Sequence, residues 1–346
     1  TLLSLLVLAV MAAGIRGCGK KEGERTNAQI KGAGASFPAP LYSKWFSEYS
    51  KLNAGVKINY QSIGSGGGVK QLTEGTVDFG ASDSPMTEEE LKNAETKNNT
   101  KVIHVPATIG AVVLSYNLPE VTKPLNLTGD VIAEIYLGTI KKWNDPKIAK
   151  INEGVSLPDK EIITVYRTDG SGTTYIFTDY LASISETWKK DVGVSKTVKF
   201  PVGQGGKGNE GVAGVVKQMP YSIGYIELIY AIQNKLGYAN VKNANEEFIT
   251  PSLESVTKAA EVSLPDMPET LTSSIVNPKG TGAYPISSYT YLLLFEKGKD
   301  AGKQKTIVEF IKWALSDGQK YAKELGYSPL PADVSKKAID KLLNIK

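Results

Sequence analysis

From residue 30 onwards, short apolar runs alternate with amphipathic stretches, and glycine-rich turns separate them. Runs of strand length occur at 57–62, 77–82, 111–116, 162–167, 222–227 and 289–296. Stretches with helical periodicity lie between them, at 38–50, 130–137, 174–184, 212–219 and 307–315. This alternation is typical of α/β proteins, in which helices cover a largely parallel sheet. A chain of 346 residues, at roughly 150 residues per domain, predicts two such units.

Three segments rich in glycine and hydroxyl residues stand directly before predicted helices, at 32–37, 64–68 and 169–174. The first N–H groups of a helix have no backbone partner, and the summed peptide dipoles place partial positive charge beside them. Glycine lets the backbone approach a ligand closely, and serine or threonine adds a hydroxyl donor. Three such segments in one chain predict an anion-binding site.

Two charged residues lie where predicted strands end. Arg167 ends the strand before the third segment, and Asp83 follows the strand 77–82. Ligands of open α/β sheets lie beyond the carboxyl ends of the strands, so we expect both residues in the site. A guanidinium group binds a tetrahedral oxyanion in bidentate fashion. The alternative is an ion pair of Arg167 with Asp83 or Asp169 that involves no ligand.

Asp83 narrows the choice of anion. A carboxylate only accepts hydrogen bonds, so its partner must carry a proton. Phosphate near neutral pH always carries a P–OH group, whereas sulfate carries none. A buried charged group left without a partner costs about 1.5–3 kcal/mol or more. An aspartate among anion-binding loops therefore predicts phosphate over sulfate.

The scarce residues exclude several classes of protein. One Cys and one His rule out an internal disulfide and nearly rule out a zinc site. His104 lies in the apolar run 102–106, where we expect a strand histidine with a satisfied hydrogen bond rather than a catalytic base. The net charge of +4 and the scattered lysines do not indicate a nucleic-acid binder.

The glycine-rich segment 203–209 lacks a Walker A pattern, and we expect it at the mouth of the site.

Six collinear segments, at 32–40, 63–71, 77–83, 135–144, 167–173 and 205–209, resemble the phosphate-binding proteins of high-affinity bacterial phosphate ABC transporters. The resemblance covers about residues 30–335. It implies a two-lobed periplasmic-binding-protein fold of type II, in which each lobe is a mixed sheet flanked by helices and a ligand cleft lies between the lobes. Lobe 1 would comprise 28–114 and 285–346, and lobe 2 would comprise 115–284.

The resemblance also implies a set of phosphate contacts. By motif matching these are Ser36, the backbone N–H of Phe37, Ser65, Asp83, Arg167, Ser171, Gly172 and Thr173. Two positions depart from the family pattern: Ser36 stands where threonine is common, and Gly66 where a second serine is common.

The function implied is that of a monomeric, extracytoplasmic component of an importer. It would close around inorganic phosphate and deliver it to the membrane permease, without a cofactor and without catalysis. Three alternatives remain. They are a phosphatase or phosphotransferase, which would need a nucleophile with a base or metal ions, a binder of another oxyanion such as sulfate or molybdate, and a sensor built on the same fold.

The N-terminal segment indicates export. Residues 1–15 form an apolar run that is too short to span a bilayer and fits a secretory signal. Cys18 follows this run, as at a lipoprotein processing site, although Arg16 stands where a small residue is usual. We therefore expect a signal over 1–18, a tether over 19–29 and Cys18 as a candidate lipidation site. The protein would lie in the periplasm or on the outer face of the cytoplasmic membrane. The alternative is a secreted protein with an incidental Cys.

Overall fold

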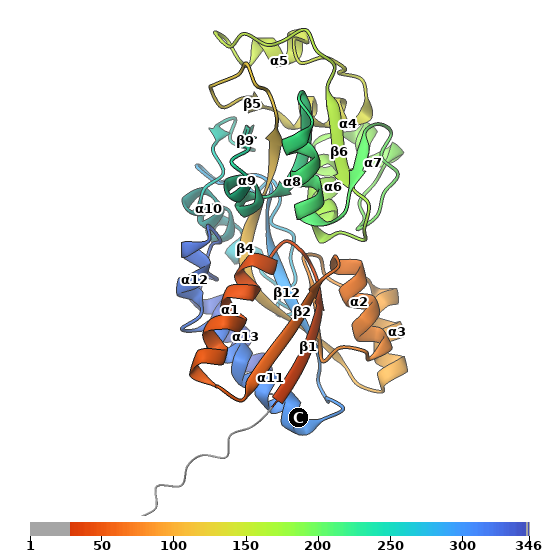
Figure 1. The fold of residues 1–346 in the computed structure, drawn as a ribbon, viewed down its shortest axis with the longest axis vertical. Helices are drawn as coiled ribbons and strands as arrows, with labels where there is room; N and C mark the ends of the chain where they lie inside the picture. The colour runs from red at the N-terminus through yellow and green to blue at the C-terminus, as the bar shows by residue number, and fades with distance from the viewer. Residues whose placement is uncertain (1–27, 344, 346) are drawn as a thin grey trace, which may run out of the picture.

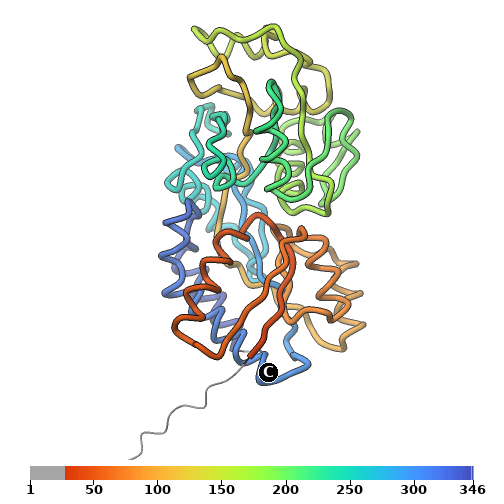
Figure 2. The backbone as a smooth tube through the Cα atoms, in the orientation of Figure 1, coloured from red at the N-terminus to blue at the C-terminus, as the bar shows by residue number. Residues whose placement is uncertain are grey.

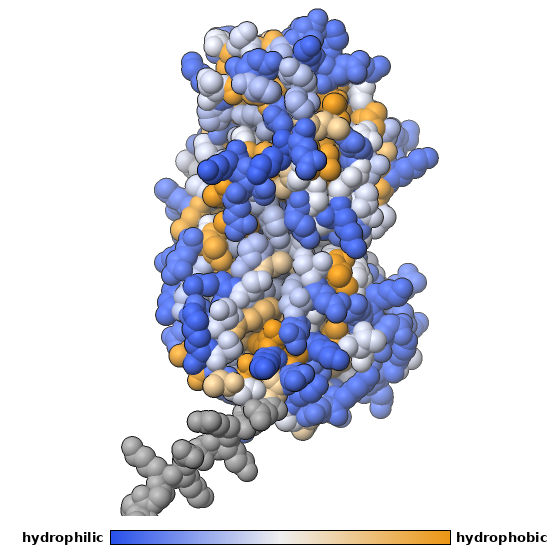
Figure 3. All heavy atoms as spheres, viewed as in Figure 1, coloured by the Kyte–Doolittle hydropathy of each residue, from blue (hydrophilic) through white to orange (hydrophobic). Residues whose placement is uncertain are grey.

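The computed structural model describes residues 28–343 and 345, so the predicted signal, Cys18 and the tether up to residue 27 lie outside the described residues. The chain forms two lobes stacked along the long axis of the molecule (Figure 1). The space-filling view narrows between them and is polar over most of this face (Figure 3). The predicted α/β fold with two lobes and mixed sheets is confirmed.

One nine-stranded sheet runs through both lobes in the order β2-β1-β3-β12-β4-β8-β6-β7, with β9 beside β4. Its strands are β1 (Ala28–Gly34), β2 (Val56–Ser62), β3 (Phe79–Ser82), β4 (Val102–Tyr116), β6 (Ile163–Arg167), β7 (Gln204–Gly206), β8 (Ser222–Glu227), β9 (Gly237–Tyr238) and β12 (Ser287–Phe295). A small sheet in the order β11-β10-β5 contains β5 (Asn126–Leu127), β10 (Asn240–Lys242) and β11 (Phe248–Ile249).

The long strand β4 connects the lobes, as the tube in Figure 2 traces. It pairs with β12 as far as Ala111 and with β8 from Val112 onwards. We call the part built on β1, β2, β3 and β12 lobe 1, and the part built on β6, β7 and β8 lobe 2. The boundary predicted between 114 and 115 falls inside β4, shortly after this change of partner.

Strand directions decide where loops meet. In lobe 1, β1 runs parallel to β2 and β3, and β12 runs antiparallel to both β3 and β4. In lobe 2, β8 runs antiparallel to β4 and parallel to β6, which is parallel to β7. The carboxyl ends of β1–β3 and of β6–β8 therefore point toward each other across the interface between the lobes. The expectation of a largely parallel sheet was wrong at its centre, where β12 and β4 are antiparallel to their neighbours.

Helices cover both faces of the sheet. They are α1 (Ala39–Leu52), α2 (Ser65–Glu74), α3 (Glu88–Asn98), α4 (Gly129–Leu137), α5 (Pro146–Lys150), α6 (Gly172–Ile184), α7 (Glu186–Asp191), α8 (Gly208–Gln218), α9 (Leu228–Asn234), α10 (Leu253–Ser263), α11 (Ala301–Leu315), α12 (Gln319–Glu324) and α13 (Ala332–Leu342). In α1 the apolar stripe predicted from the sequence packs inward, and Leu41, Trp45 and Tyr49 are buried. The indole N–H of Trp45 donates to the carbonyl of Gly318, 2.8 Å away, which ties α1 to the C-terminal helices.

The first glycine-rich segment is not the loop that the sequence suggests. Its residues Gly32 and Gly34 belong to β1, a strand that sequence reasoning missed. A Cβ atom on Gly32 would lie 2.1 Å from Cζ of Phe79, so glycine is needed there for close packing against a neighbouring strand rather than for a turn. The connection to α1 is only residues 35–38. The helices that follow the second and third glycine-rich segments are α2 and α6. They begin earlier than predicted, at Ser65 and Gly172.

Candidate anion-binding site

The facing strand ends bring the predicted residues together. Ser36 follows β1, Ser65 opens α2 after β2, and Asp83 follows β3, all in lobe 1. Arg167 ends β6 in lobe 2, and Ser171, Gly172 and Thr173 form the start of α6. The side chains of Ser36, Ser65, Asp83, Arg167, Ser171 and Thr173 are all buried. The structure therefore places the predicted set at one interface, with contributions from both lobes.

Direct hydrogen bonds join the lobes at this point. The N–H of Gly172 donates to Oγ of Ser65 over 3.1 Å. The N–H of Gly66 donates to the carbonyl of Gly170 over 2.8 Å. The second and third glycine-rich segments therefore lie against each other. A side chain at Gly66 would approach Cα of Gly170 to 3.2 Å, so the absence of a serine there allows this close contact.

Asp83 is almost fully buried, with 2% of its surface exposed. Its Oδ1 accepts a hydrogen bond from Oγ1 of Thr290 over 2.8 Å, and its Oδ2 lies 3.3 Å from Oγ of Ser65. Burial raises the pKa of Asp83 to about 7, although the Thr290 hydrogen bond and the charge of Arg167 act in the opposite direction. The carboxyl group thus titrates in the same pH range as phosphate itself.

Arg167 is held by Asp169 rather than by Asp83. Its Nε donates to Oδ1 of Asp169 over 2.8 Å, and its Nη2 donates to Oδ2 over 2.5 Å. Burial alone would raise the pKa of Asp169, but the hydrogen bonds and charge of Arg167 hold it below its ordinary value. A third N–H, on Nη1, donates to Oγ1 of Thr173 over 3.0 Å. Three of the five guanidinium N–H groups are thereby used, which leaves one N–H on Nη1 and one on Nη2 without an acceptor among the described residues.

Backbone donors complete the predicted set. Among the described residues, the N–H of Phe37 has no hydrogen-bond acceptor, while the carbonyl of Phe37 accepts from the Tyr327 hydroxyl over 2.7 Å. Oγ of Ser171 caps α6 by accepting from the N–H of Thr174 over 3.0 Å. The start of α6 therefore offers the positive end of a helix dipole to the interface.

Sequence reasoning missed two residues of this cluster. Asn209 is buried at the start of α8, and its side chain contacts both Ser36 and Thr173. Thr290 lies in the middle of β12, where only the tertiary pairing of β12 with β3 brings it to Asp83. No periodicity in the sequence marks Asn209, because its place is set by the short strand β7 before it, which is parallel to β6 and ends at the same edge of the sheet. The segment 203–209 thus reaches the centre of the cluster at Asn209.

His104 has the structural role predicted for it. It lies in β4 and is buried, and its Nε2 accepts a hydrogen bond from the N–H of Met86 over 3.0 Å. Burial lowers the pKa of His104 to about 4. Within the described part of the chain, no three His, Cys, Asp or Glu side chains are grouped so that they could hold a metal ion.

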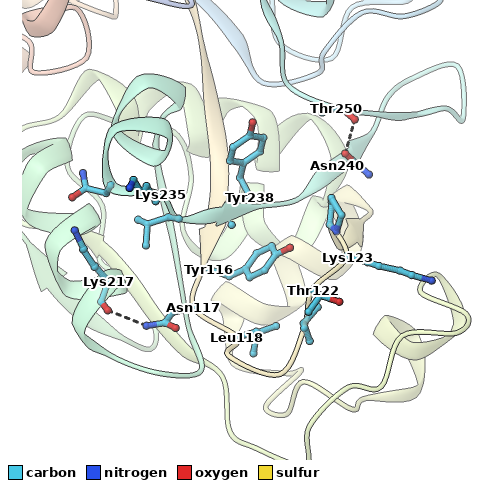
Figure 4. Close-up of a pocket in the computed structure, with 15 residues that line it drawn as sticks. Tyr116, Asn117, Leu118, Thr122, Lys123, Lys217, Lys235, Tyr238, Asn240 and Thr250 are labelled. Carbon is cyan, nitrogen blue, oxygen red and sulfur yellow. Dashed lines mark hydrogen bonds between the residues drawn. The ribbon is translucent and has the colours of Figure 1, made fainter.

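A separate cavity of about 650 Å³ lies in lobe 2, beside β4 and β9. It is lined by Tyr116, Tyr238 and three lysines, none of which was predicted for the site (Figure 4). In that view Lys217 and Lys235 lie on one side of Tyr116 and Lys123 on the other, so the ammonium groups share no common point. This cavity does not resemble a site for a small oxyanion.

Comparison with known proteins identifies the family. The model of the PBP superfamily domain matches residues 20–318. The phosphate-binding protein PstS of Pasteurella multocida is 48% identical over 314 residues, which cover 90% of this chain and 89% of that protein. The phosphate-binding protein PstS of Methanocaldococcus jannaschii is 38% identical over 367 residues, which cover 99% of this chain and 94% of that protein.

Solved structures share the fold. A phosphate-binding protein from Stenotrophomonas maltophilia superposes with a TM-score of 0.71 at 19% identity and covers 90% of this chain and 93% of its own. A putative phosphate ABC transporter substrate-binding protein from Clostridium perfringens, solved with bound phosphate, gives a TM-score of 0.62 at 19% identity. The match covers 88% of this chain and 100% of that protein.

Proposed function

Since the chain belongs to the PBP superfamily and, within it, to the family of phosphate-binding proteins PstS, we propose that it binds inorganic phosphate between its two lobes and delivers it to the permease of an ABC importer. The protein binds its solute and does no chemistry on it. The residues that hold phosphate in this proposal are Ser36, Phe37, Ser65, Asp83, Arg167, Ser171, Gly172 and Thr173.

One observation carries the proposal: the buried carboxyl group of Asp83 stands among hydrogen-bond donors that come from both lobes. The donors are the hydroxyl groups of Ser36, Ser171 and Thr173, the guanidinium of Arg167 and the N–H groups at Phe37 and at the start of α6. A protonated oxyanion matches this set, because its oxygens accept from the donors while its P–OH donates to Asp83. Sulfate would leave Asp83 opposite an acceptor, so the site favours phosphate.

Phosphate binding is coupled to closure of the lobes in this proposal. Ser36, Ser65 and Asp83 lie in lobe 1, whereas Arg167 to Thr173 lie in lobe 2. An anion held by both groups stabilises the arrangement in which the lobes touch, because only that arrangement completes its hydrogen bonds. The moving parts are residues 28–114 with 285–346 and residues 115–284, with β4 as one of the connections.

The location follows from the same assignment. The protein acts outside the cytoplasmic membrane as a monomer, and Cys18 is a candidate site for a lipid anchor. Two acyl chains on that residue would hold it stably at the outer face of the membrane. Among the described residues, none of the helices has the length and apolarity needed to cross a membrane.

Calorimetric titration of phosphate and of sulfate into the purified protein, freed of carried-over ligand by unfolding and refolding, tests the proposal. We expect one phosphate bound per chain, no heat with sulfate, and unaltered phosphate afterwards. Folded, ligand-free protein that gives no phosphate heat would refute the function. Equal binding of sulfate would leave the fold unaffected but remove the argument from Asp83.

A further inference from the structure

Asn209 joins the two lobes from a fully buried position. It is the second residue of α8 in lobe 2, and only Lys207 separates this helix from β7. Its backbone N–H and its side-chain Nδ2 both donate to Oγ of Ser36 in lobe 1, over 3.1 Å and 2.9 Å. Nδ2 also lies 3.1 Å from Oγ1 of Thr173. One amide group therefore contacts a hydroxyl group from each lobe.

A backbone donor fixes the orientation of this amide. The N–H of Glu227, at the carboxyl end of β8, donates to Oδ1 of Asn209 over 2.8 Å. A backbone N–H only donates, so the oxygen of the amide must face it and the NH₂ group must face the two hydroxyls. The position of Oδ1 is thus set by the sheet itself.

The NH₂ group in turn fixes the direction of both hydroxyls. A hydroxyl oxygen has one proton and two acceptor positions. On Ser36 both acceptor positions are filled by the two N–H donors of Asn209. On Thr173 they are filled by Nδ2 of Asn209 and Nη1 of Arg167. Each hydroxyl is left able only to donate, and among the described residues neither has an acceptor for its proton.

We infer that Asn209 is a positioning residue of the phosphate site, which makes Ser36 and Thr173 obligate donors to the anion. The inference rests on the proposed function. The direction of the Ser36 hydroxyl then depends on closure of the lobes, because that hydroxyl is fixed only when lobe 2 brings Asn209 against lobe 1. The closed protein then offers an oxyanion donors whose direction is already set, which lowers the cost of ordering them on binding.

Two substitutions separate this role from simple packing. Asn209→Asp has almost the same shape and keeps an oxygen for the Glu227 N–H, but it replaces the NH₂ donor by an acceptor. The Ser36 and Thr173 hydroxyls would then donate to residue 209 and turn away from the anion. Asn209→Ala removes the amide and leaves both hydroxyls free to rotate toward the ligand. We expect phosphate affinity to fall about tenfold for Asn209→Ala and at least a hundredfold for Asn209→Asp.

The pH dependence distinguishes donor reversal from a packing defect. Protonation of the introduced carboxyl restores a donor, so the ratio of the Asn209→Asp dissociation constant to that of the unaltered protein should shrink between pH 8 and pH 5.5. The corresponding ratio for Asn209→Ala should stay constant. A packing role alone predicts the larger loss for alanine and no change of either ratio with pH.

A double-mutant cycle separates donor reversal from repulsion between the new carboxylate and phosphate. Ser36→Ala removes one of the two hydroxyls, so the penalty of Asn209→Asp should be several-fold smaller in that background. An equal penalty in both backgrounds would mean that charge alone acts, and would overturn the inference.

The unaltered protein is the reference in every titration, so the two proposals fail separately. Loss of phosphate binding by the unaltered protein refutes the function. Phosphate binding by the unaltered protein, with equal affinity in Asn209→Asp, refutes only the role of Asn209. If Asn209→Asp does not fold, Asn209→Ala decides, because unchanged affinity in that variant also overturns the inference.

Discussion

Glu90 of lobe 1 and Lys196 of lobe 2 form an ion pair across the interface, with 2.5 Å between Oε1 and Nζ. Glu90 also closes the capping box of α3, because its Oε2 accepts from the N–H of Thr87 over 2.9 Å. The carbonyl of Lys196 accepts from the N–H of Ser171 over 2.8 Å. The ion pair is therefore connected to the loop proposed to hold phosphate.

Glu90→Gln should weaken phosphate binding by about two- to fivefold, mainly through faster dissociation, because glutamine keeps the helix cap but loses the charge that attracts Lys196. The effect should fade at high salt. Stopped-flow displacement and calorimetry at two ionic strengths measure it. Glu89→Gln, an exposed neighbour on the same turn, is the matched control. An equal change in both variants would show that the charge of the helix, not the contact between the lobes, is responsible.

The buried carboxyl of Asp83 predicts a specific pH dependence of binding. Its pKa of about 7 means that the ligand-free site binds a proton below that pH, and this proton must be released before the carboxylate accepts the P–OH of phosphate. The contribution of Asp83 to phosphate affinity should therefore fall as pH drops from 8 to 6, by up to about tenfold per pH unit below 7, with release of the Asp83 proton on binding.

Asp83→Asn is the control for this dependence, because phosphate titrates in the same range in both proteins. The variant should bind at least a hundredfold more weakly at pH 8 and should show only the pH slope of phosphate itself. Calorimetry in two buffers of different ionisation enthalpy counts the protons released. Identical slopes for the two proteins would contradict the role of Asp83 as acceptor.

Gly64→Ala should hinder closure of the lobes. Gly64 has φ +85°, and an added Cβ would lie 2.2 Å from Oδ2 of Asp169 and 2.7 Å from the carbonyl of Gly170 in the opposite lobe. We expect at least a tenfold loss of phosphate affinity, since the clash arises only when the lobes meet. The backbone strain itself should cost about 1–3 kcal/mol of stability.

Gly154→Ala is a matched control for that strain, measured by calorimetry and thermal unfolding. Gly154 also has a positive φ of +75°, but a Cβ there would meet no atom of the described residues within 4 Å. It should lose stability and keep its affinity for phosphate. Binding by Gly64→Ala at the affinity of the unaltered protein would show that the lobes do not need this close approach.

The site residues that could be predicted from the sequence are those marked by a pattern in the residues next to them. Asp83 follows a strand whose apolar pattern is readable, so the rule that ligands lie at carboxyl ends placed it correctly at the edge of the sheet. Ser65 lies in a glycine-rich segment directly before a helix, which is also a local pattern. Asn209 follows the three-residue strand β7, which is too short for any periodicity. Thr290 contacts Asp83 from 207 positions away, a pairing that depends on how β12 inserts between β3 and β4.

At β1 the glycines led to the prediction of a loop where the structure has a strand, and the reason is physical. Glycine at a turn supplies conformational freedom, whereas at Gly32 it supplies space for the ring of Phe79. The two causes leave the same residue in the sequence, and only the packing of neighbouring strands distinguishes them.

His104 predicts that the stability of the ligand-free protein depends on pH. Its folded pKa of about 4 lies below the ordinary value of 6.5, since burial disfavours the charged ring and Lys341 and Lys196 repel it, while Glu90 acts in the opposite direction. The unfolded chain therefore binds the proton first, and this part of the stability is lost as pH falls from 6.5 toward 4. At pH 5 the loss should be about 2 kcal/mol. Asp83, whose pKa is raised, acts in the opposite sense over the same range.

The difference between the unaltered protein and His104→Gln isolates the histidine, because the contribution of Asp83 is common to both. Glutamine can still accept the hydrogen bond from the N–H of Met86 but does not titrate. Urea unfolding in phosphate-free buffer at pH 7 and pH 5 gives the two free energies of unfolding. His104→Gln should lose about 2 kcal/mol less than the unaltered protein over this interval. Equal losses in the two proteins would mean that His104 takes up its proton without unfolding, through an opening of the contact with Met86.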